Sequence, residues 1–431
     1  MPLRVHLRSL GCKVNLADAR ETLARLGERV RLEEEPEKAD VVLLNTCTVT
    51  HKADRDSRKI LGSLGKELPG LPVVVTGCAT RTCRESLARY PNVRCVIDPG
   101  EPERVAQALL SAAGRDFEEI HGRSFAGCGM HVLERQRAFL KVQDGCNSRC
   151  SYCVIPSVRG PERSLEISEV ERNFQALVSA GHLEIVLVGI HLGRYGVAEG
   201  RSLVWLLERL ERLCERTDWP GRIRLTSIEP AEWTEELLQY LSQSKRVCPH
   251  FHIPVQSGSA TVLARMGRRQ DPDAIAHLLD RLARDFPDAA LGTDIITGFP
   301  QESDAEAAET ERWVEKMPFS YLHVFQYSKR PMTPAAQMEG QIHPLLIRQR
   351  SRHLLEIGRD KWLRFLRRGI GRHHDVIVER MTGDLHTGRS ESYRKLRWKS
   401  PKSSACKGEL ARVLGKSVRD GWLVGEPVLE G

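Results

Sequence analysis

The stretch Cys146-Asn147-Ser148-Arg149-Cys150-Ser151-Tyr152-Cys153 places three thiols in one short loop with C-x3-C-x2-C spacing. Thiolates this close in sequence can bind one metal centre, and three of them can hold a 4Fe-4S cluster with one iron left open. A structural zinc site is the alternative, but such sites almost always take four ligands. The sequence holds no second C-x2-C or H-x3-H pair, so the spacing favours an iron–sulfur cluster.

This loop resembles the signature of the radical SAM superfamily, whose members bind S-adenosylmethionine (SAM) at the open iron. The resemblance implies that Cys146, Cys150 and Cys153 hold a 4Fe-4S cluster and act directly in catalysis. It also implies a partial (βα)6 barrel of the TIM type around that cluster.

Length and composition indicate a multidomain globular protein. The 431 residues exceed what one hydrophobic core usually supports. No apolar run approaches the roughly 18 residues of a membrane span, so we expect no membrane partner. The first ten residues are interrupted by charge and do not read as a signal peptide. Twelve cysteines in such a chain favour metal binding over disulfides, and we expect a cytoplasmic protein.

Positive charge is concentrated at the C-terminal end of the chain. Residues 341–431 contain 20 Lys or Arg and 10 Asp or Glu, whereas the whole chain carries a net charge of +8. The preceding residues therefore sum to −2. A basic end on a near-neutral body is typical of a nucleic-acid partner, although a basic surface that only aids solubility would look the same.

A second group of three cysteines follows three predicted strands in the first part of the chain. Residues 3–10, 40–44 and 72–76 read as strands, and helices are predicted between them at 17–27 and 55–68. In such a βαβ series, ligands bind beyond the carboxyl ends of parallel strands. The cysteines at these ends could form another three-thiolate site: Cys12, Cys47 and Cys78. The remaining cysteines share no spacing and are assigned to packing or surface.

The central part of the chain alternates strands and helices, as a barrel requires. Strands are predicted at 138–142, 184–188, 222–226, 250–255, 291–296 and 321–325, with helices at 168–180, 203–216, 274–285 and 304–315. The cysteine loop follows the first of these strands, where barrel enzymes place their chemistry. Polar or glycine-rich residues follow the other strands and are candidate SAM contacts. With the loop tyrosine, these candidates are Tyr152, Gly189, Ser227, Gln256 and Thr297.

The segment after about residue 370 reads as a small antiparallel β-barrel. Short strands are predicted at 375–379, 396–398 and 409–414, separated by glycines, as in barrels that bind single-stranded nucleic acid. Aromatic rings alternate with cations in one stretch, a pattern that suits base stacking and phosphate contact. The candidate RNA-binding residues there are Tyr393, Arg394, Lys395, Arg397 and Trp398. A basic helix at 348–368 precedes this segment, and a linker is predicted at 114–137.

Over nearly its whole length the chain is similar to the radical SAM methylthiotransferase family. The similarity rests on Gly11-Cys12-Lys13-Val14-Asn15, Asn45-Thr46-Cys47-Thr48-Val49-Thr50, Gln143-Asp144-Gly145-Cys146 and Tyr327-Ser328-Lys329-Arg330. It implies an N-terminal α/β domain with a parallel sheet at 1–125, a radical SAM barrel at 132–366 and a TRAM-like RNA-binding barrel at 367–431. The chain departs from the family pattern at Ala79-Thr80 and at Gln270, and in the detail of its last domain.

The resemblance implies a complete reaction. Cys12, Cys47 and Cys78 would hold an auxiliary 4Fe-4S cluster that carries the sulfur, and a second SAM would methylate that sulfur. The cofactors would be two 4Fe-4S clusters and SAM; the partners would be a tRNA anticodon stem-loop, an electron donor and a sulfur source. The branch most similar methylthiolates C2 of N6-threonylcarbamoyladenosine beside the anticodon.

Other functions remain open from the sequence. The same chemistry could act on N6-isopentenyladenosine in tRNA or on a ribosomal protein side chain. A non-catalytic iron–sulfur regulator that binds RNA is an alternative from another class, and SAM cleavage would separate it from an enzyme. A cobalamin-dependent methylase is disfavoured because the N-terminal segment has no D-x-H-x-x-G motif.

Overall fold

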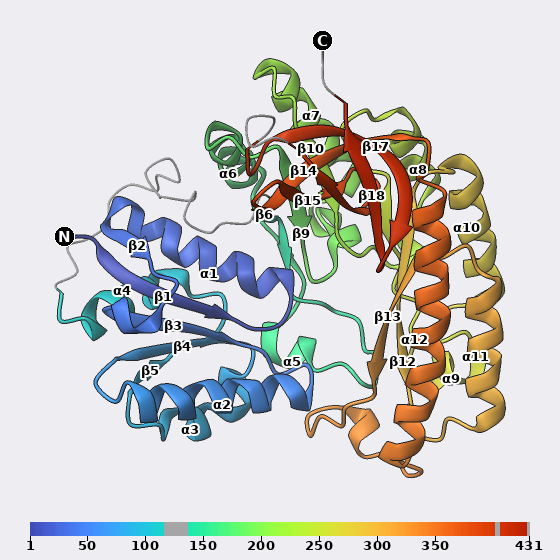
Figure 1. Ribbon diagram of the computed structural model, residues 1–431. Helices are drawn as coiled ribbons and strands as arrows, with labels where there is room; N and C mark the ends of the chain where they lie inside the picture. Colours follow the sequence, from blue (N-terminus) through green and yellow to red (C-terminus); the bar gives the residue numbers. More distant parts are fainter. Residues whose placement is uncertain (116–136, 401–405, 429–431) are drawn as a thin grey trace.

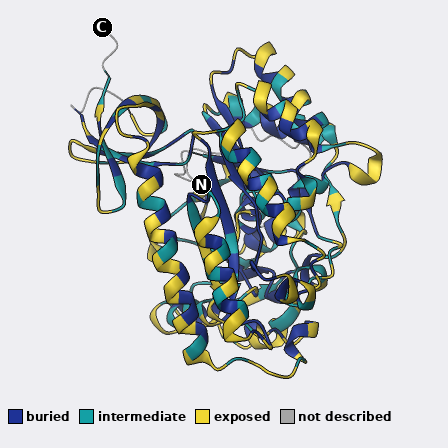
Figure 2. Cartoon of the chain, turned by 90° about the vertical axis from the view of Figure 1, so that its right-hand side faces the viewer, coloured by how far each residue is buried: buried dark blue, intermediate teal, exposed yellow. Residues whose placement is uncertain are grey.

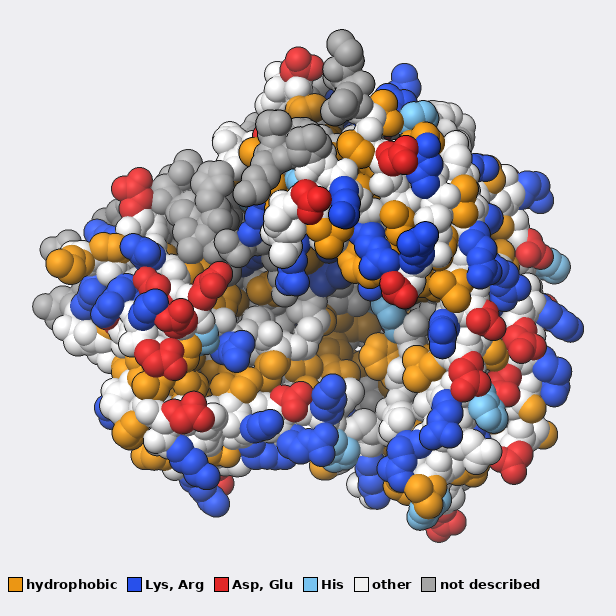
Figure 3. Space-filling view, in the orientation of Figure 1, with side chains coloured by type: hydrophobic (Ala, Val, Ile, Leu, Met, Phe, Trp, Pro, Cys, Tyr) orange, Lys and Arg blue, Asp and Glu red, His pale blue; other side chains and the backbone are white. Residues whose placement is uncertain are grey.

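Three parts of the chain are visible in its computed structural model (Figure 1). The space-filling view shows a central hollow between them (Figure 3). The structure describes residues 1–115, 137–400 and 406–428. The linker predicted at 114–137 therefore lies almost entirely outside the described residues, and so does Cys128. Within them, no helix has the combination of length and apolar character that crossing a bilayer demands.

The first part of the chain is here called the N-terminal sheet domain. It is built on a five-stranded parallel sheet with strand order β2-β1-β3-β4-β5. Its strands are β1 Leu3–Ser9, β2 Val30–Leu32, β3 Val41–Thr46, β4 Val73–Gly77 and β5 Val93–Val96, and its helices are α1 Lys13–Leu26, α2 His51–Glu67, α3 Thr80–Ala88 and α4 Pro102–Ala112. Helices α1 and α4 pack on one face and α2 and α3 on the other. Burial on both faces explains why β3 is apolar and buried almost throughout.

The second part is a half-barrel built from two parallel three-stranded sheets, β10-β9-β6 and β11-β12-β13. Isolated parallel bridges such as Ser227–His252 join them, so the six predicted strands form two linked sheets rather than one. The strands are β6 Ala138–Lys141, β9 Glu184–Val188, β10 Arg222–Leu225, β11 His250–His252, β12 Ala290–Thr297 and β13 Tyr321–Gln326. A short antiparallel pair, β7 Gln143–Asp144 and β8 Arg163–Ser164, flanks the cysteine loop.

Helices cover the outside of the half-barrel and leave its inner face toward the hollow. They are α6 Ile167–Ser179, α7 Leu203–Arg216, α8 Glu235–Gln243, α9 Ala260–Arg265, α10 Pro272–Asp285, α11 Asp304–Lys316 and α12 Pro344–Arg367. Helix α5 Ile155–Arg159 instead packs on Cys78 of the N-terminal sheet domain. Figure 2 shows the strands buried beneath helices whose outer faces are exposed. The main hydrophobic core lies between these helices and the strands.

The third part is a closed five-stranded barrel, here called the C-terminal barrel, with order β14-β15-β16-β18-β17. Its strands are β14 His373–Thr382, β15 Leu385–Ser390, β16 Lys395–Lys399, β17 Leu410–Arg419 and β18 Trp422–Pro427. The expected antiparallel barrel needs one correction, because β16 and β18 pair in parallel. Leu366 of α12 enters the core of this barrel, so α12 joins it to the half-barrel.

The N-terminal sheet domain docks on the half-barrel through α1. Val14 and Ala17 share an apolar cluster with Phe139 and the strand β9. Beside it, the Lys141 ammonium lies 2.6 Å from an Asp18 carboxylate oxygen. These contacts fix the edge that carries Cys12 against the start of the half-barrel.

A buried carboxylate attaches the C-terminal barrel to the start of the half-barrel strands. The Glu184 carboxylate is fully buried and pairs with Arg222 and Arg224 at 2.7 Å each. Both arginines also donate to backbone carbonyls of the C-terminal barrel, including those of Asp375 and Ser390. Burial opposes the charged form, but the two guanidinium groups hold the pKa of Glu184 well below its usual range.

Replacing Glu184 by Gln should therefore destabilise the protein strongly. The change leaves two arginines buried without their carboxylate, which costs about 3–5 kcal/mol of unfolding free energy. Since the folded pKa is depressed, this difference is present above the unfolded pKa of about 4.3 and is lost as pH falls below it. Urea unfolding at several pH values measures it. Glu235→Gln, which breaks an exposed pair with Arg281, should leave stability unchanged, and equal effects of both variants would contradict this account.

Candidate cluster and cofactor site

The cysteine loop is held between the β7–β8 pair and helix α9. Gly145 precedes it with a φ of +70°, and a Cβ there would lie 1.9 Å from the carbonyl oxygen of Pro161. The amide of Cys146 donates to Gly160 at 3.2 Å, and the amide of Ser151 donates to Met266 at 2.8 Å. The turn that brings the thiols together is thus anchored at both ends, and only glycine fits before it.

Each thiol in this loop has a distinct electrostatic environment. Burial opposes the thiolate of Cys146, but the His191 ring, 3.4 Å away, and the Ser148 amide outweigh it and lower the pKa of Cys146. Burial, together with the charges of Cys150 and Cys146, raises the pKa of Cys153 to about 12. Buried thiolates that repel one another need a cationic centre to hold them deprotonated, as an iron–sulfur cluster does.

Cys12, Cys47 and Cys78 follow the adjacent strands β1, β3 and β4 at the carboxyl edge of the N-terminal sheet. Gly11 has a φ of +90°, and a Cβ there would lie 2.8 Å from the Cys47 sulfur. Burial, together with the neighbouring Cys78 and Cys12, raises the pKa of Cys47 to about 12. This second group of thiols converges as the first does, and both fit a cluster held by three thiolates.

Arg159 connects the two groups of cysteines, although the sequence analysis did not single it out. The side chain is buried, and its Nε donates to the Cys78 sulfur at 3.4 Å. Its other nitrogens pair with Asp144 beside the cysteine loop at 3.1 Å and with Asp18 of α1 at 2.9 Å. Val154 and Val158 pack on Cys78 in one apolar cluster. Helix α5, which follows the first cysteine group, therefore rests directly on the second.

A cavity of about 200 Å³ lies beside Cys153, with walls from both domains. The N-terminal sheet domain contributes Val49 and Thr50, two and three residues after Cys47. The rest of the lining comes from the cysteine loop and the strand ends of the half-barrel: Tyr152, Cys153, Val154, Ile155, Gln256, Asp294, Ile296, Phe325, Gln326, Tyr327 and Ser328. A molecule bound here would contact Cys153 and the segment that follows Cys47.

Contacts across this cavity hold the two domains together. The Arg330 guanidinium is buried, pairs with Asp54 of α2 and donates to the Thr48 carbonyl at 2.9 Å. The amide of His51 donates to the Ser328 hydroxyl at 3.0 Å. The motif Tyr327-Ser328-Lys329-Arg330 therefore fastens the cavity wall to the domain that carries Cys47.

Two of the five predicted SAM contacts line this cavity, whereas the other three have different neighbours. Tyr152 and Gln256 line the cavity. Gly189 lies against Gln143, where a Cβ would be 3.0 Å from the amide oxygen. The Thr297 hydroxyl is buried and bonds to Ser351 of α12 at 2.7 Å, so its side chain packs against that helix rather than facing the cavity.

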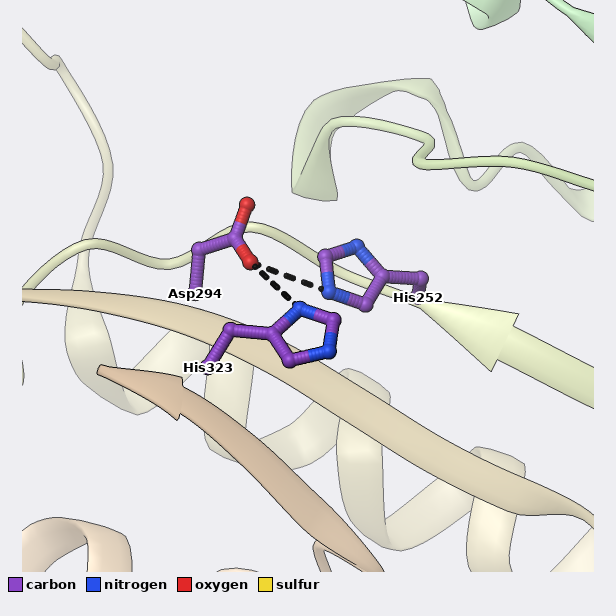
Figure 4. A group of neighbouring side chains, drawn as sticks. All are labelled: His252, Asp294 and His323. Atoms are coloured by element: carbon purple, nitrogen blue, oxygen red, sulfur yellow. Dashed lines mark hydrogen bonds and ion pairs between the residues drawn. The ribbon is translucent and has the colours of Figure 1, made fainter. Parts of the chain in front are cut away.

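Ser227 belongs to a polar group on the inner face that the sequence analysis missed. Its hydroxyl lies 2.8 Å from His252 Nδ1. His252 Nε2 and His323 Nδ1 lie 3.2 and 3.1 Å from the same Asp294 oxygen (Figure 4). The three ligand-type atoms lie within 4.8 Å of one another, but both imidazoles already meet the carboxylate. Residues 321, 323 and 325 are two apart along β13 and therefore share one face of the sheet. This spacing is the sequence signal from which the inner face could be predicted.

Replacing Asp294 by Asn should weaken SAM cleavage without loss of the clusters. Asp294 lines the cavity, and its carboxylate is hydrogen-bonded to His323 and lies 3.2 Å from His252 Nε2, whereas an amide oxygen carries no charge to hold both imidazoles. Loss of the geometry of the cavity walls should lower the rate of SAM cleavage about 10- to 100-fold. The release of 5′-deoxyadenosine measures this, with iron content as the control. A variant that cleaves SAM at the wild-type rate would contradict a positioning role.

The candidate RNA-binding stretch is divided by the pleat of strand β16. Trp398 is 2% and Arg394 is 1% exposed, and Trp398 lies in the core of the C-terminal barrel. We correct the prediction that Trp398 and Arg394 contact RNA, because these buried side chains present no face to a base. Lys395 and Arg397 are partly exposed on the other face of the strand. Tyr393, in the turn before the strand, stacks on His250 of the half-barrel.

Two family models match the chain. The radical SAM superfamily matches residues 140–314, and a family described as uncharacterized protein family UPF0004 matches residues 4–98. Among solved structures, a radical SAM methyltransferase, TsrM, from Kitasatospora setae with cobalamin and a 4Fe-4S cluster bound is 15% identical. It has a TM-score of 0.57 and covers 78% of this chain and 77% of that one. At this identity the likeness concerns the fold alone.

Curated relatives are more similar in sequence. The threonylcarbamoyladenosine tRNA methylthiotransferase MtaB of Bacillus subtilis is 36% identical over 82% of this chain and 80% of its own length. The protein of the same name from Chlamydia pneumoniae is 33% identical over 90% and 89%. A tRNA-2-methylthio-N(6)-dimethylallyladenosine synthase from Parafrankia is also 33% identical, over 89% and 80%.

Proposed function

This chain belongs to the radical SAM methylthiotransferase family, and from that premise we propose that it methylthiolates C2 of N6-threonylcarbamoyladenosine beside the anticodon of tRNA. The observation that carries the choice of substrate is the 36% identity, over 82% of the chain, to an enzyme named for that nucleoside. The reaction class follows from the family: an enzyme that uses SAM and 4Fe-4S clusters to modify tRNA.

In this proposal the two cysteine groups hold one cluster each. Cys146, Cys150 and Cys153 would hold the cluster that supplies the radical chemistry with SAM, and Cys12, Cys47 and Cys78 would hold the cluster that supplies sulfur. When bound, these groups supply the radical and sulfur chemistry that side chains cannot perform. Three domains share the work: a cluster-binding domain at 1–125, a radical SAM barrel at 132–366 and an RNA-binding domain at 367–431.

The side chains around the cavity bind, orient and shield the reactants. The cavity beside Cys153 receives the target base and SAM, with Tyr152 and Gln256 on its walls. Val49, Ile155 and Phe325 supply apolar walls that exclude water. Arg159 and Arg268 donate to the Cys78 and Cys150 sulfurs, which places a positive charge beside each group of thiolates. The base must be unstacked to enter, as bases of an anticodon loop can be.

Mass spectrometry of tRNA nucleosides from cells with and without the gene tests the proposal. We expect the methylthio form of threonylcarbamoyladenosine to disappear on deletion while the unmethylthiolated nucleoside accumulates. The 33% identity to a dimethylallyladenosine enzyme makes that nucleoside the second candidate, and its methylthio form would disappear instead if this were the substrate. If deletion changed neither nucleoside, both candidate tRNA substrates would be refuted.

A further inference from the structure

Five cations from all three parts of the chain meet at the start of the half-barrel strands. This cation cluster is defined as Lys13 of α1, Arg137, Arg222 and Arg224 of the half-barrel, and Arg389 of the C-terminal barrel. Figure 3 shows Lys and Arg side chains gathered along the edge of the central hollow below the C-terminal barrel. Lys13 interacts electrostatically with Arg137, Arg224 and Arg389, and with the phenol of Tyr393 between them.

Carboxylates compensate only part of this positive charge. Glu184 pairs with Arg222 and Arg224, and Glu379 lies 3.1 Å from Arg137 and 3.7 Å from Arg389. Even if the nearby Glu391, which pairs with His374, is counted, two positive charges are left over. Among the residues that the structure describes, no ion pair neutralises the Lys13 ammonium, and Lys13 as a residue is exposed.

Buried polar atoms at the same place lack a hydrogen-bond partner. Arg389 Nε is buried without a hydrogen bond, and so is Nδ1 of His250, a side chain that is 2% exposed. Tyr393 lies between them, 4.2 Å from both the His250 ring and the Arg389 guanidinium carbon. Tyr393 has a φ of +67°, a conformation that a non-glycine residue adopts only at an energetic cost. A polar ligand would complete these groups.

Aromatic rings connect the cation cluster to the reaction cavity. Ring centroids are 5.9 Å apart between Tyr393 and Tyr321, 5.2 Å between Tyr321 and His323, and 6.5 Å between His323 and Phe325. His323 and Phe325 are exposed on this path, and Phe325 lines the cavity. The five β13 residues from Tyr321 to Phe325 span about 13 Å at about 3.3 Å per step, a distance that one nucleotide with its substituents can bridge.

We infer that Lys13, Arg389 and Tyr393 form a subsite for an anionic group of the RNA, whose target base lies at the other end of the aromatic path. The inference rests on the proposed function, because it takes the base in the cavity as given. The anion is either a backbone phosphate next to the target nucleotide or the carboxylate of its threonylcarbamoyl group. Arg222 and Arg224 are committed to Glu184 and to backbone carbonyls, so the ligand contacts fall to Lys13 and to Arg389, whose side chain is 19% exposed.

Binding measurements on the full-length protein with both clusters loaded test the subsite. The probes are anticodon stem-loops that carry either threonylcarbamoyladenosine or plain adenosine at the target position, titrated at fixed salt because phosphate contacts depend on it. We expect Lys13→Gln to weaken binding about tenfold, the loss typical of one charged hydrogen bond. Lys13→Arg should bind within about twofold of wild type because it keeps the charge.

One further variant tests the same subsite independently, and another serves as a control. Arg389→Gln lies in the C-terminal barrel, away from the cysteines, and should weaken binding as Lys13→Gln does even if the latter disturbs Cys12. Lys316→Gln removes an exposed charge at the end of α11 and should change nothing.

The two RNAs identify the anion. A loss with both RNAs assigns a phosphate, and a loss confined to the modified RNA assigns the carboxylate. Unchanged binding in Arg389→Gln and Lys13→Gln, or an equal loss in Lys316→Gln, would overturn the subsite. If the wild-type enzyme bound both RNAs but methylthiolated neither, the proposed substrate would fail while the binding comparison kept its meaning.

Discussion

Replacing Cys150 by Ala should abolish SAM cleavage, with a loss of at least about 1,000-fold in the rate of 5′-deoxyadenosine release, because two thiolates do not hold the cluster that activates SAM. Cys150 lies in the middle of the loop, and the Arg268 guanidinium is 3.7 Å from its sulfur. Iron content after anaerobic reconstitution should fall from about eight to about four atoms per chain. Release of 5′-deoxyadenosine under reducing conditions, measured beside iron content, checks both expectations.

Cys214 provides the matched control for this variant. It is a buried cysteine in the core of the half-barrel, away from both cysteine groups in the chain. Cys214→Ala should keep the full iron content and cleave SAM at the wild-type rate. If Cys150→Ala cleaved SAM at the wild-type rate, the cysteine loop would have no role in the reaction.

Replacing Cys12 by Ala should separate SAM cleavage from sulfur insertion. Cys12 is exposed at the start of α1, so its removal costs little packing, but it deprives the second cluster of one ligand. We expect 5′-deoxyadenosine formation to continue while methylthiolated tRNA falls below about one hundredth of the wild-type level. Product is measured by mass spectrometry of digested tRNA, and cleavage by chromatography of the same reaction.

The contrast between the two variants is the informative result. The two cysteine groups have separate loops and separate strands, and they share Arg159 as a neighbour. If Cys12→Ala also stopped SAM cleavage, the two groups would not divide the reaction as proposed. Cys95→Ala, which changes a half-buried cysteine of β5 outside both groups, should leave both products unchanged.

The strands and the family could be predicted from the sequence because their signals are local. The buried run at residues 41–46 and the alternation along β13 require only neighbouring residues to be read. Ion pairs that cross domains have no such signal. Arg159 meets Asp18, and Arg330 meets Asp54, across separations of more than 100 residues, so only the folded chain reveals them.

The misassigned aromatic in β16 has a physical explanation. Alternate side chains of a strand point to opposite faces, and both faces of β16 carry long side chains. Leu396 and Trp398 point into the C-terminal barrel, whereas Lys395, Arg397 and Lys399 are at least partly exposed. An aromatic between cations looks the same in sequence whether it stacks on a base or fills a core, and only closure of the barrel decides between them.

The docking of α1 limits how members of this family can be recombined. Residues of α1 pair with Lys141 and Arg159, which lie beyond the linker on the other side of the junction. A chimaera that exchanges residues 1–115 alone would therefore inherit one half of each pair. A graft of a foreign sulfur-donating domain onto this barrel should therefore also exchange the barrel residues that pair with it, Lys141, Arg159 and Arg330.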